Sequence, residues 1–118
     1  MRHFQISEFD SPDAPGSGVK MDKHFLDMLD CIREEADIPF HINSGYRTAA
    51  YNRTLKDSTP NSAHTRGMAV DIRAETGREK LLIVRAAVIH GIKRIGIGKT
   101  FIHIDCDSTL PNPTIWLY

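Results

Sequence analysis

The sequence predicts an α+β fold: a small central antiparallel sheet flanked by helices, in a single domain of residues 1–118. Two segments, 22–36 and 76–90, have the residue pattern of helices, and short segments around them have the composition of strands. Two of these strands, 95–97 and 101–105, are separated only by a short turn, so we expect them to pair antiparallel. The length of 118 residues and the 41% hydrophobic content fit one globular core.

The chain begins with an expected N-terminal arm and loop, residues 1–20, in which turn-forming residues are frequent from Ser11 to Gly18. The first helix is expected next, where apolar residues recur at spacings of three and four between charged ones. These residues are Phe25, Leu26, Leu29, Ile32 and Ala36. We therefore expect this helix to cover one side of the core.

A proline ends the first helix, and a strand is expected directly after it. Pro39 cannot continue the helix, and residues 40–43 alternate apolar with polar, as a half-buried strand does. After a Ser-Gly turn, the polar segment 47–55 is compatible with a helix. The next segment, 56–61, is a predicted loop because it contains the turn-forming residues Asp57, Ser58 and Pro60.

The second half of the chain combines short strands with one helix. Residues 69–72 are largely apolar and include β-branched side chains, which predicts a strand. The helix begins at the capping-box pair Thr76 and Glu79 and ends at Gly91. The two strands of the hairpin follow, and after two prolines regular structure is expected again only at 115–118.

The overall charge argues against several classes of partner. Fifteen basic residues balance 15 acidic ones, so we expect neither nucleic acid nor an anionic membrane as a partner. No apolar run approaches the length of a spanning helix, and the first ten residues lack the apolar stretch of a secretory signal. We expect a monomer made in the cytoplasm, with Cys31 and Cys106 reduced and used for packing.

Three residues have side chains that suit a metal ion. His64 and Asp71 are separated by six residues that include a glycine, so a tight bend can bring them together. His103 lies in a predicted strand where Ile102 and Ile104 face the other side, so its ring projects toward a neighbouring strand. Zinc takes nitrogen and oxygen ligands, and a catalytic site leaves a fourth position for water. From spacing alone, a hydrogen-bonded core His103 and a surface His64 remain an alternative.

A longer motif contains these residues. The order Ser-x-His-x-x-Gly-x-Ala-x-Asp, with a later histidine, is formed by Ser62, His64, Gly67, Ala69, Asp71 and His103. It resembles the signature of the zinc D-alanyl-D-alanine carboxypeptidases. The D-Ala-D-Ala dipeptidases of vancomycin resistance and the phage L-alanyl-D-glutamate endolysins have the same pattern, and these proteins share a fold with the hedgehog signalling domain. The segment 44–48, Ser-Gly-Tyr-Arg-Thr, with Tyr51 and Asn52, is also similar to the family, and the resemblance runs from about Asp22 to Asp105.

The resemblance implies roles for several residues. The implied zinc ligands are His64, Asp71 and His103. Arg47 is implied to face the substrate carbonyl or carboxylate, which suits a planar guanidinium with several donors. The alternative is a solvated arginine. Tyr46 and Ser62 complete the expected substrate-binding set, although Ser62 equally well caps the loop before the first histidine ligand.

The general base departs from the family pattern. In the best-known members an acidic residue lies three positions before the second histidine ligand, and that position is Thr100 here. A threonine hydroxyl cannot take a proton from zinc-bound water at neutral pH. We therefore assign the base to Asp105, which shares a strand face with His103. Two other roles stay open for Asp105: orienting a ligand histidine, or binding the metal directly.

Other residues that can carry chemistry have weaker signals. Asp107 is expected to be a surface charge, and Cys106 is expected on the strand face opposite the ligands. Trp116 and Tyr118 either wall the substrate cleft or cover the core. The remaining histidines lack partners at useful spacing and are expected to be structural or solvated; they are His3, His24, His41 and His90.

The function implied by the resemblance is zinc-dependent hydrolysis of amide bonds in peptidoglycan stem peptides, at the bacterial cell wall. Carboxypeptidase and L,D-endopeptidase or endolysin action, from a phage or a bacterium, all remain open. The alternative function is a catalytically inactive, zinc-stabilised module that binds peptidoglycan or a protein. The missing acid at Thr100 is the reason to keep that alternative.

Overall fold

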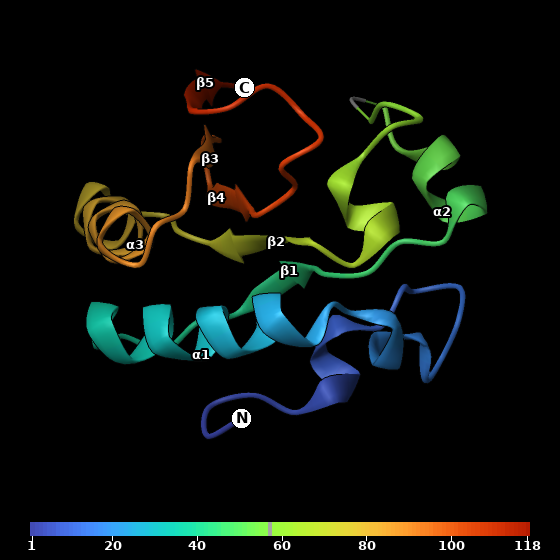
Figure 1. Cartoon of the computed structure of the whole chain (residues 1–118), viewed down its shortest axis with the longest axis horizontal. Coiled ribbons are helices and arrows are strands. Elements are labelled where there is room, and N and C mark those ends of the chain that lie inside the picture. Colours follow the sequence, from blue (N-terminus) through green and yellow to red (C-terminus); the bar gives the residue numbers. More distant parts are fainter. Residues whose placement is uncertain (57) are drawn as a thin grey trace.

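A computed structural model describes residues 1–56 and 58–118, so the part of the predicted loop that falls on Asp57 lies outside the described residues. The described elements form a five-stranded sheet with helices packed beside it (Figure 1). The helices are α1 (Lys23–Ala36), α2 (Ala49–Thr54) and α3 (Gly77–Ile89). The strands are β1 (Ile42–Ser44), β2 (Ala69–Arg73), β3 (Arg94–Ile97), β4 (Phe101–Asp105) and β5 (Thr114–Leu117).

The predicted α+β class is confirmed, with one difference in the sheet. Its strand order is β1-β2-β4-β3-β5, and every neighbouring pair is antiparallel except β3 and β5, which are parallel. After β4 ends, the connection stays at the end of the sheet where β3 begins, and the Thr114 N–H donates to Lys93 O over 2.8 Å. Because β5 starts beside the start of β3, it must run in the same direction.

The hydrophobic core lies on one face of the sheet, against α1 and α3. Alternate residues of the central strands point into it: Val70, Ile72, Ile102 and Ile104, all fully buried. The two helices contribute Phe25, Leu29 and Ile32 from α1, and Ile83, Ala86 and Ala87 from α3. This packing leaves the opposite face of β2 and β4 for polar side chains, because successive residues of a strand point to opposite sides.

The N-terminal arm supports the turn that precedes α2. It contains two short 3₁₀ helices, η1 (Ile6–Phe9) and η2 (Ser17–Lys20), and Phe9 is fully buried in the core. Phe9 O accepts the Tyr46 N–H over 2.9 Å, and a Cβ added to Gly45 would lie 2.8 Å from Phe9 Cα. Only glycine therefore fits at position 45, directly before Tyr46 and Arg47.

None of the helices in the described part of the chain combines the length and the apolar character needed to cross a bilayer.

Candidate metal centre

Asp71 and His103 meet because their strands pair in register. They are directly opposite partners on β2 and β4, and both point away from the core. His103 Nδ1 lies 2.9 Å from Asp71 Oδ1. The sheet thus brings together two residues that are far apart in the sequence.

His64 reaches the same point from the short 3₁₀ helix η3 (Ala63–Arg66) that precedes β2. Ser62 caps this helix by accepting the His64 N–H over 3.2 Å, and Gly67 ends it with φ of 70°, a left-handed conformation. His64 Nδ1 donates to Gly45 O at 2.8 Å, which leaves Nε2 directed at Asp71, 3.3 Å from its Oδ1. The local turn therefore fixes which nitrogen of His64 faces the site.

His64, Asp71 and His103 form a possible metal site. Each offers one ligand atom, and these atoms all lie within 4.8 Å of one another. Two imidazole nitrogens and a carboxylate oxygen are a donor set that suits zinc. The three side chains also line a cavity of about 700 Å³, so the site is accessible from one side.

The charges in this cluster are strongly coupled. Burial alone would raise the pKa of the Asp71 carboxyl, but hydrogen bonds from His103 and His64 hold it far below its usual range. Burial lowers the pKa of His64. Burial would also lower the pKa of His103, but the carboxylates of Asp105 and Asp71 raise it above its usual value. A cation bound here would replace the proton between His103 and Asp71.

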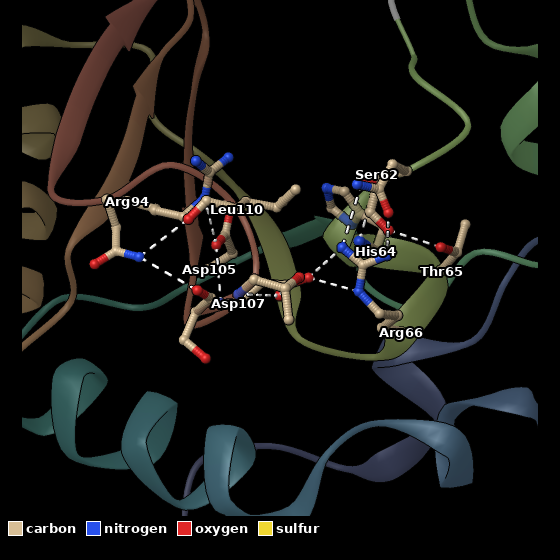
Figure 2. Close-up of polar contacts among 12 residues, drawn as sticks. Ser62, His64, Thr65, Arg66, Arg94, Asp105, Asp107 and Leu110 are labelled. Carbon is tan, nitrogen blue, oxygen red and sulfur yellow. Dashed lines mark hydrogen bonds and ion pairs between the residues drawn. The ribbon is translucent and has the colours of Figure 1, made fainter.

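Asp105 lies behind His103 and is almost completely buried, with 1% of its side chain exposed. Its Oδ2 is 2.7 Å from His103 Nε2, the ring nitrogen that does not face Asp71. Its Oδ1 accepts the Arg94 Nε–H over 2.9 Å and the Asp107 N–H over 3.1 Å (Figure 2). Both carboxylate oxygens are therefore engaged within the protein.

Arg47 is held against the triad by its own hydrogen bonds. Its Nε, NH1 and NH2 donate to Ser44 Oγ at 3.0 Å, Asn52 Oδ1 at 3.2 Å and Asp71 Oδ2 at 3.1 Å. Burial lowers its pKa, although the Asp71 charge opposes this. Three of its five N–H groups are used, which leaves two. Arg47 thus steadies Asp71 and still lines the cavity.

Two other residues named from the sequence lie apart from the triad. Tyr46 is half-buried against the core, with Lys20 Nζ 5.8 Å from its ring centre, and it is not among the residues that line the cavity. Thr100 is exposed in the turn between β3 and β4, where its carbonyl accepts the Ala74 N–H. Ser62, in contrast, both caps η3 and lines the cavity.

The expectation that Asp107 is a surface charge was wrong. Its side chain is 1% exposed. The Arg66 Nε–H donates to Asp107 Oδ2 over 2.6 Å (Figure 2). The Thr109 N–H and hydroxyl donate to Asp107 Oδ1 over 3.1 and 2.6 Å. Arg66 and the segment after β4 thus cover this carboxylate. The alternation of residues along a strand does not predict such a contact.

The two cysteines have different environments. Both are free thiols in the structure. Cys106 is half-buried, and burial raises the pKa of its thiol to about 11. Cys31 is exposed on α1, so the expectation that it packs in the core was wrong.

The sequence did not single out Arg94, although it touches Asp105 and lines the cavity. Trp116, Tyr118 and Phe101 also line the cavity, which agrees with the cleft-wall alternative for the two C-terminal aromatic residues. The only signal for Arg94 is its alternation with the apolar Ile95, and its partner depends on the β3–β4 register. A single sequence does not contain that register.

The fold and the geometry together define an α+β protein with a possible His-Asp-His metal site beside an open cavity. The family model described as Peptidase M15 matches residues 2–105, and the chain belongs to this family. In fold it is similar to the crystal structure of the Serratia marcescens L-Ala D-Glu endopeptidase ChiX, with a TM-score of 0.55 and 20% sequence identity. That match covers 74% of this chain and 80% of the Serratia chain. A comparison with curated protein sequences finds no match.

Proposed function

We propose that this chain is a zinc-dependent peptidase that hydrolyses amide bonds in peptidoglycan stem peptides at the bacterial cell wall. The observation that carries the proposal is the gathering of three ligand atoms within 4.8 Å beside a cavity of about 700 Å³. The proposed zinc ligands are His64, Asp71 and His103. Membership of the peptidase M15 family supports the reaction class.

The surroundings of the two histidines fit zinc. Ligand histidines in zinc sites donate their second ring nitrogen to a carboxylate or a backbone carbonyl, which fixes the tautomer and the ring orientation. His64 has such a partner in Gly45 O at 2.8 Å, and His103 has one in Asp105 at 2.7 Å. The other nitrogen of each ring is therefore directed toward Asp71, where a metal ion would be held.

A zinc ion held here would supply Lewis acidity and a bound water of lowered pKa. The residues of the chain supply the rest. Arg47 has two N–H groups left, which suit the carbonyl oxygen or a carboxylate of the substrate. Ser62 lines the same cavity and has a hydroxyl available for hydrogen bonding. We propose both as substrate-binding residues.

The first bond to test is L-Ala–D-Glu. Support comes from the Serratia endopeptidase, whose fold is similar, and from the volume of the open cavity, about 700 Å³, which is large enough for part of a peptide. The cavity is also lined by Lys56 and Arg47, whose positive charges suit the carboxylates of a stem peptide. Carboxypeptidase action on D-Ala-D-Ala is the other arm of the same test.

We propose that Asp105 orients His103. Its contacts favour this role over the base and direct-ligand roles, because Oδ2 meets the ring nitrogen remote from Asp71 while Oδ1 is bonded to Arg94. To act as base, the carboxylate would have to release His103 and reach water on the other side of the ring. The two roles predict different behaviour for an asparagine variant.

The proposal is tested by metal analysis together with product identification. We expect purified wild type to retain about one zinc per chain. Acting on purified peptidoglycan, it should either expose new D-Glu N-termini or release free D-alanine, and labelling of the new amino groups identifies which. His64→Ala should lose both properties, whereas His41→Ala, a change at an exposed histidine, should keep both. A wild type that binds zinc but releases neither product contradicts the enzymatic function.

A second candidate function is a zinc-stabilised binding module without turnover. It is favoured by one observation: among the described residues that line the cavity, the carboxylates are Asp71 and Asp105, and both are engaged. This function predicts that the protein binds zinc tightly and sediments with peptidoglycan, but releases no cleavage product from it. Unchanged sedimentation of His64→Ala would argue against a role for the metal in that binding.

A further inference from the structure

Arg94 joins three separate parts of the site region. It is the first residue of β3 and faces Asp105, its directly paired neighbour on β4, with Nε 2.9 Å from Oδ1. Its NH1 donates to Pro111 O over 2.6 Å, in the segment that leads to β5. Its side chain is 14% exposed, so these bonds form largely away from solvent. A buried carboxylate such as Asp105 requires a cationic partner of this kind.

The same guanidinium also lies against the only tryptophan of the chain. Arg94 Cζ is 4.8 Å from the ring centre of Trp116, a cation–π contact. The Trp116 ring lies 5.4 Å from the ring of His103. The Trp116 ring fits here because residue 96 is glycine: a Cβ added to Gly96 would lie 2.6 Å from Trp116 Nε1.

His103 is therefore contacted by two partners, Asp105 and Trp116, and Arg94 touches both. Asp105 binds the ring through Nε2 and Trp116 packs against the ring itself. Trp116 belongs to the aromatic wall, defined here as Phe101, Trp116 and Tyr118, which borders the cavity. Loss of Arg94 would therefore remove one contact from each of these two partners of His103.

We propose that Arg94 is a positioning residue that couples the metal site to the aromatic wall. It acts on the metal through Asp105 and His103, and on the substrate cleft through Trp116. The inference rests on the proposed zinc function, because it assumes that His103 is a ligand. An ion pair that served stability alone would leave the zinc affinity and the environment of Trp116 unchanged whenever the fold is intact.

The geometry demands arginine and not merely a positive charge. The planar guanidinium bonds Asp105 through Nε and Pro111 O through NH1, while its Cζ lies over the indole, 4.8 Å from the ring centre. A lysine has a compact ammonium and cannot make these contacts together. Arg94→Lys therefore keeps the charge that Asp105 needs and removes the coupling.

The test compares Arg94→Lys with Arg85→Lys, a matched change at an exposed arginine of α3. Zinc affinity is measured by competition with a chromogenic chelator, and the emission spectrum of Trp116 is recorded without metal. We expect Arg94→Lys to lower zinc affinity about 10- to 100-fold, as loss of an outer-shell partner does, and to shift the emission to longer wavelength. Arg85→Lys should match wild type in both measurements.

A folded Arg94→Lys variant with wild-type zinc affinity and emission overturns the inference. If that variant fails to fold by circular dichroism, Trp116→Phe decides: a several-fold loss of zinc affinity supports the coupling, and an unchanged affinity overturns it. A wild type without zinc overturns this inference together with the zinc function. A wild type that binds zinc but cleaves no peptidoglycan removes the enzymatic function only, and the affinity comparison still decides the role of Arg94.

Discussion

Asp71 Oδ1 and His103 Nδ1 lie 2.9 Å apart across two paired strands, β2 and β4. The contact depends on register, because a slip of one residue would turn either side chain toward the core. Five consecutive pairs hold that register, from Ala69 opposite Asp105 to Arg73 opposite Phe101. The sheet is thus the scaffold that brings the proposed ligands Asp71 and His103 together from distant segments.

Removal of the carboxylate of Asp71 should strongly weaken metal binding. Asp71→Asn keeps the shape of the side chain but removes the charge that faces both histidines and Arg47. We expect at least about a 100-fold loss of zinc affinity, because one of the three proposed ligands becomes a neutral amide. Chelator competition measures this, with Asp27→Asn on the exposed side of α1 as the control. Retained affinity would exclude Asp71 as a ligand.

Asp105→Asn and Asp105→Ala separate orientation from general-base catalysis. An asparagine carbonyl can still accept a hydrogen bond from His103 Nε2, but it cannot take a proton. If Asp105 orients the ring, the asparagine variant keeps zinc and retains more activity than the alanine variant. If it is the base, both variants lose about 10²–10⁴-fold in kcat while the asparagine variant still binds zinc. The measurements are zinc content and kcat on the same stem peptide.

Zinc should stabilise the folded chain. We expect EDTA to lower the midpoint of thermal unfolding and added zinc to restore it, because a ligand that binds only the native state shifts the unfolding equilibrium. His64→Ala should show no response to either treatment. A wild-type midpoint that is insensitive to zinc over a 1,000-fold concentration range, roughly the span that adds 4 kcal/mol for a bound ligand, would argue against the metal site.

The Asp107 carboxylate should contribute stability that disappears in acid. Burial would raise its pKa, but hydrogen bonds from Thr109 and Arg66 lower that pKa below its usual value. Because the folded pKa is the lower one, the stabilisation is present above the unfolded pKa, near 4, and is lost as the pH falls through the folded pKa. Asp107→Asn should cost about 1–3 kcal/mol at pH 7.

Urea unfolding at pH 7 and at about pH 3 checks this prediction. The difference in unfolding free energy between wild type and Asp107→Asn should shrink at the lower pH. A difference that stays constant with pH would mean that the ionised form is not what stabilises this site. Asp27→Asn, at an exposed position, provides the control for changes in overall charge.

Gly96→Ala should displace the aromatic wall. The added Cβ would lie 2.6 Å from atoms of both Trp116 and Tyr118, so the rings must move. Such overpacking costs about 1–3 kcal/mol, and we also expect a changed Trp116 emission and a raised KM. The matched control is Gly77→Ala, since nothing lies within 4 Å of a Cβ at that position. A changed emission with an unchanged KM would show that the wall does not contact the substrate, and an unchanged emission would show that the rings have not moved.

The sequence by itself determined the local elements closely. The predicted helices at 22–36 and 76–90 correspond to Lys23–Ala36 and Gly77–Ile89. Their ends are set by contacts within one turn, such as the Thr76 hydroxyl that accepts the Glu79 N–H over 3.1 Å. The motif likewise singled out the three residues that the structure brings within 4.8 Å. Helix capping and hydrophobic periodicity involve residues only a few positions apart, so both patterns can be recognised in the sequence.

Only the tertiary structure decided which residues support the three proposed ligands. The parallel pairing of β5, the burial of Asp107 beneath Arg66, and the bonds from Arg94 to Asp105 all join segments separated in sequence. Each depends on strand register or on the path of a connection, and these are set by the packing of the whole core. A polar residue has the same local sequence pattern whether it ends exposed or paired, so its partner appears only after the chain has folded.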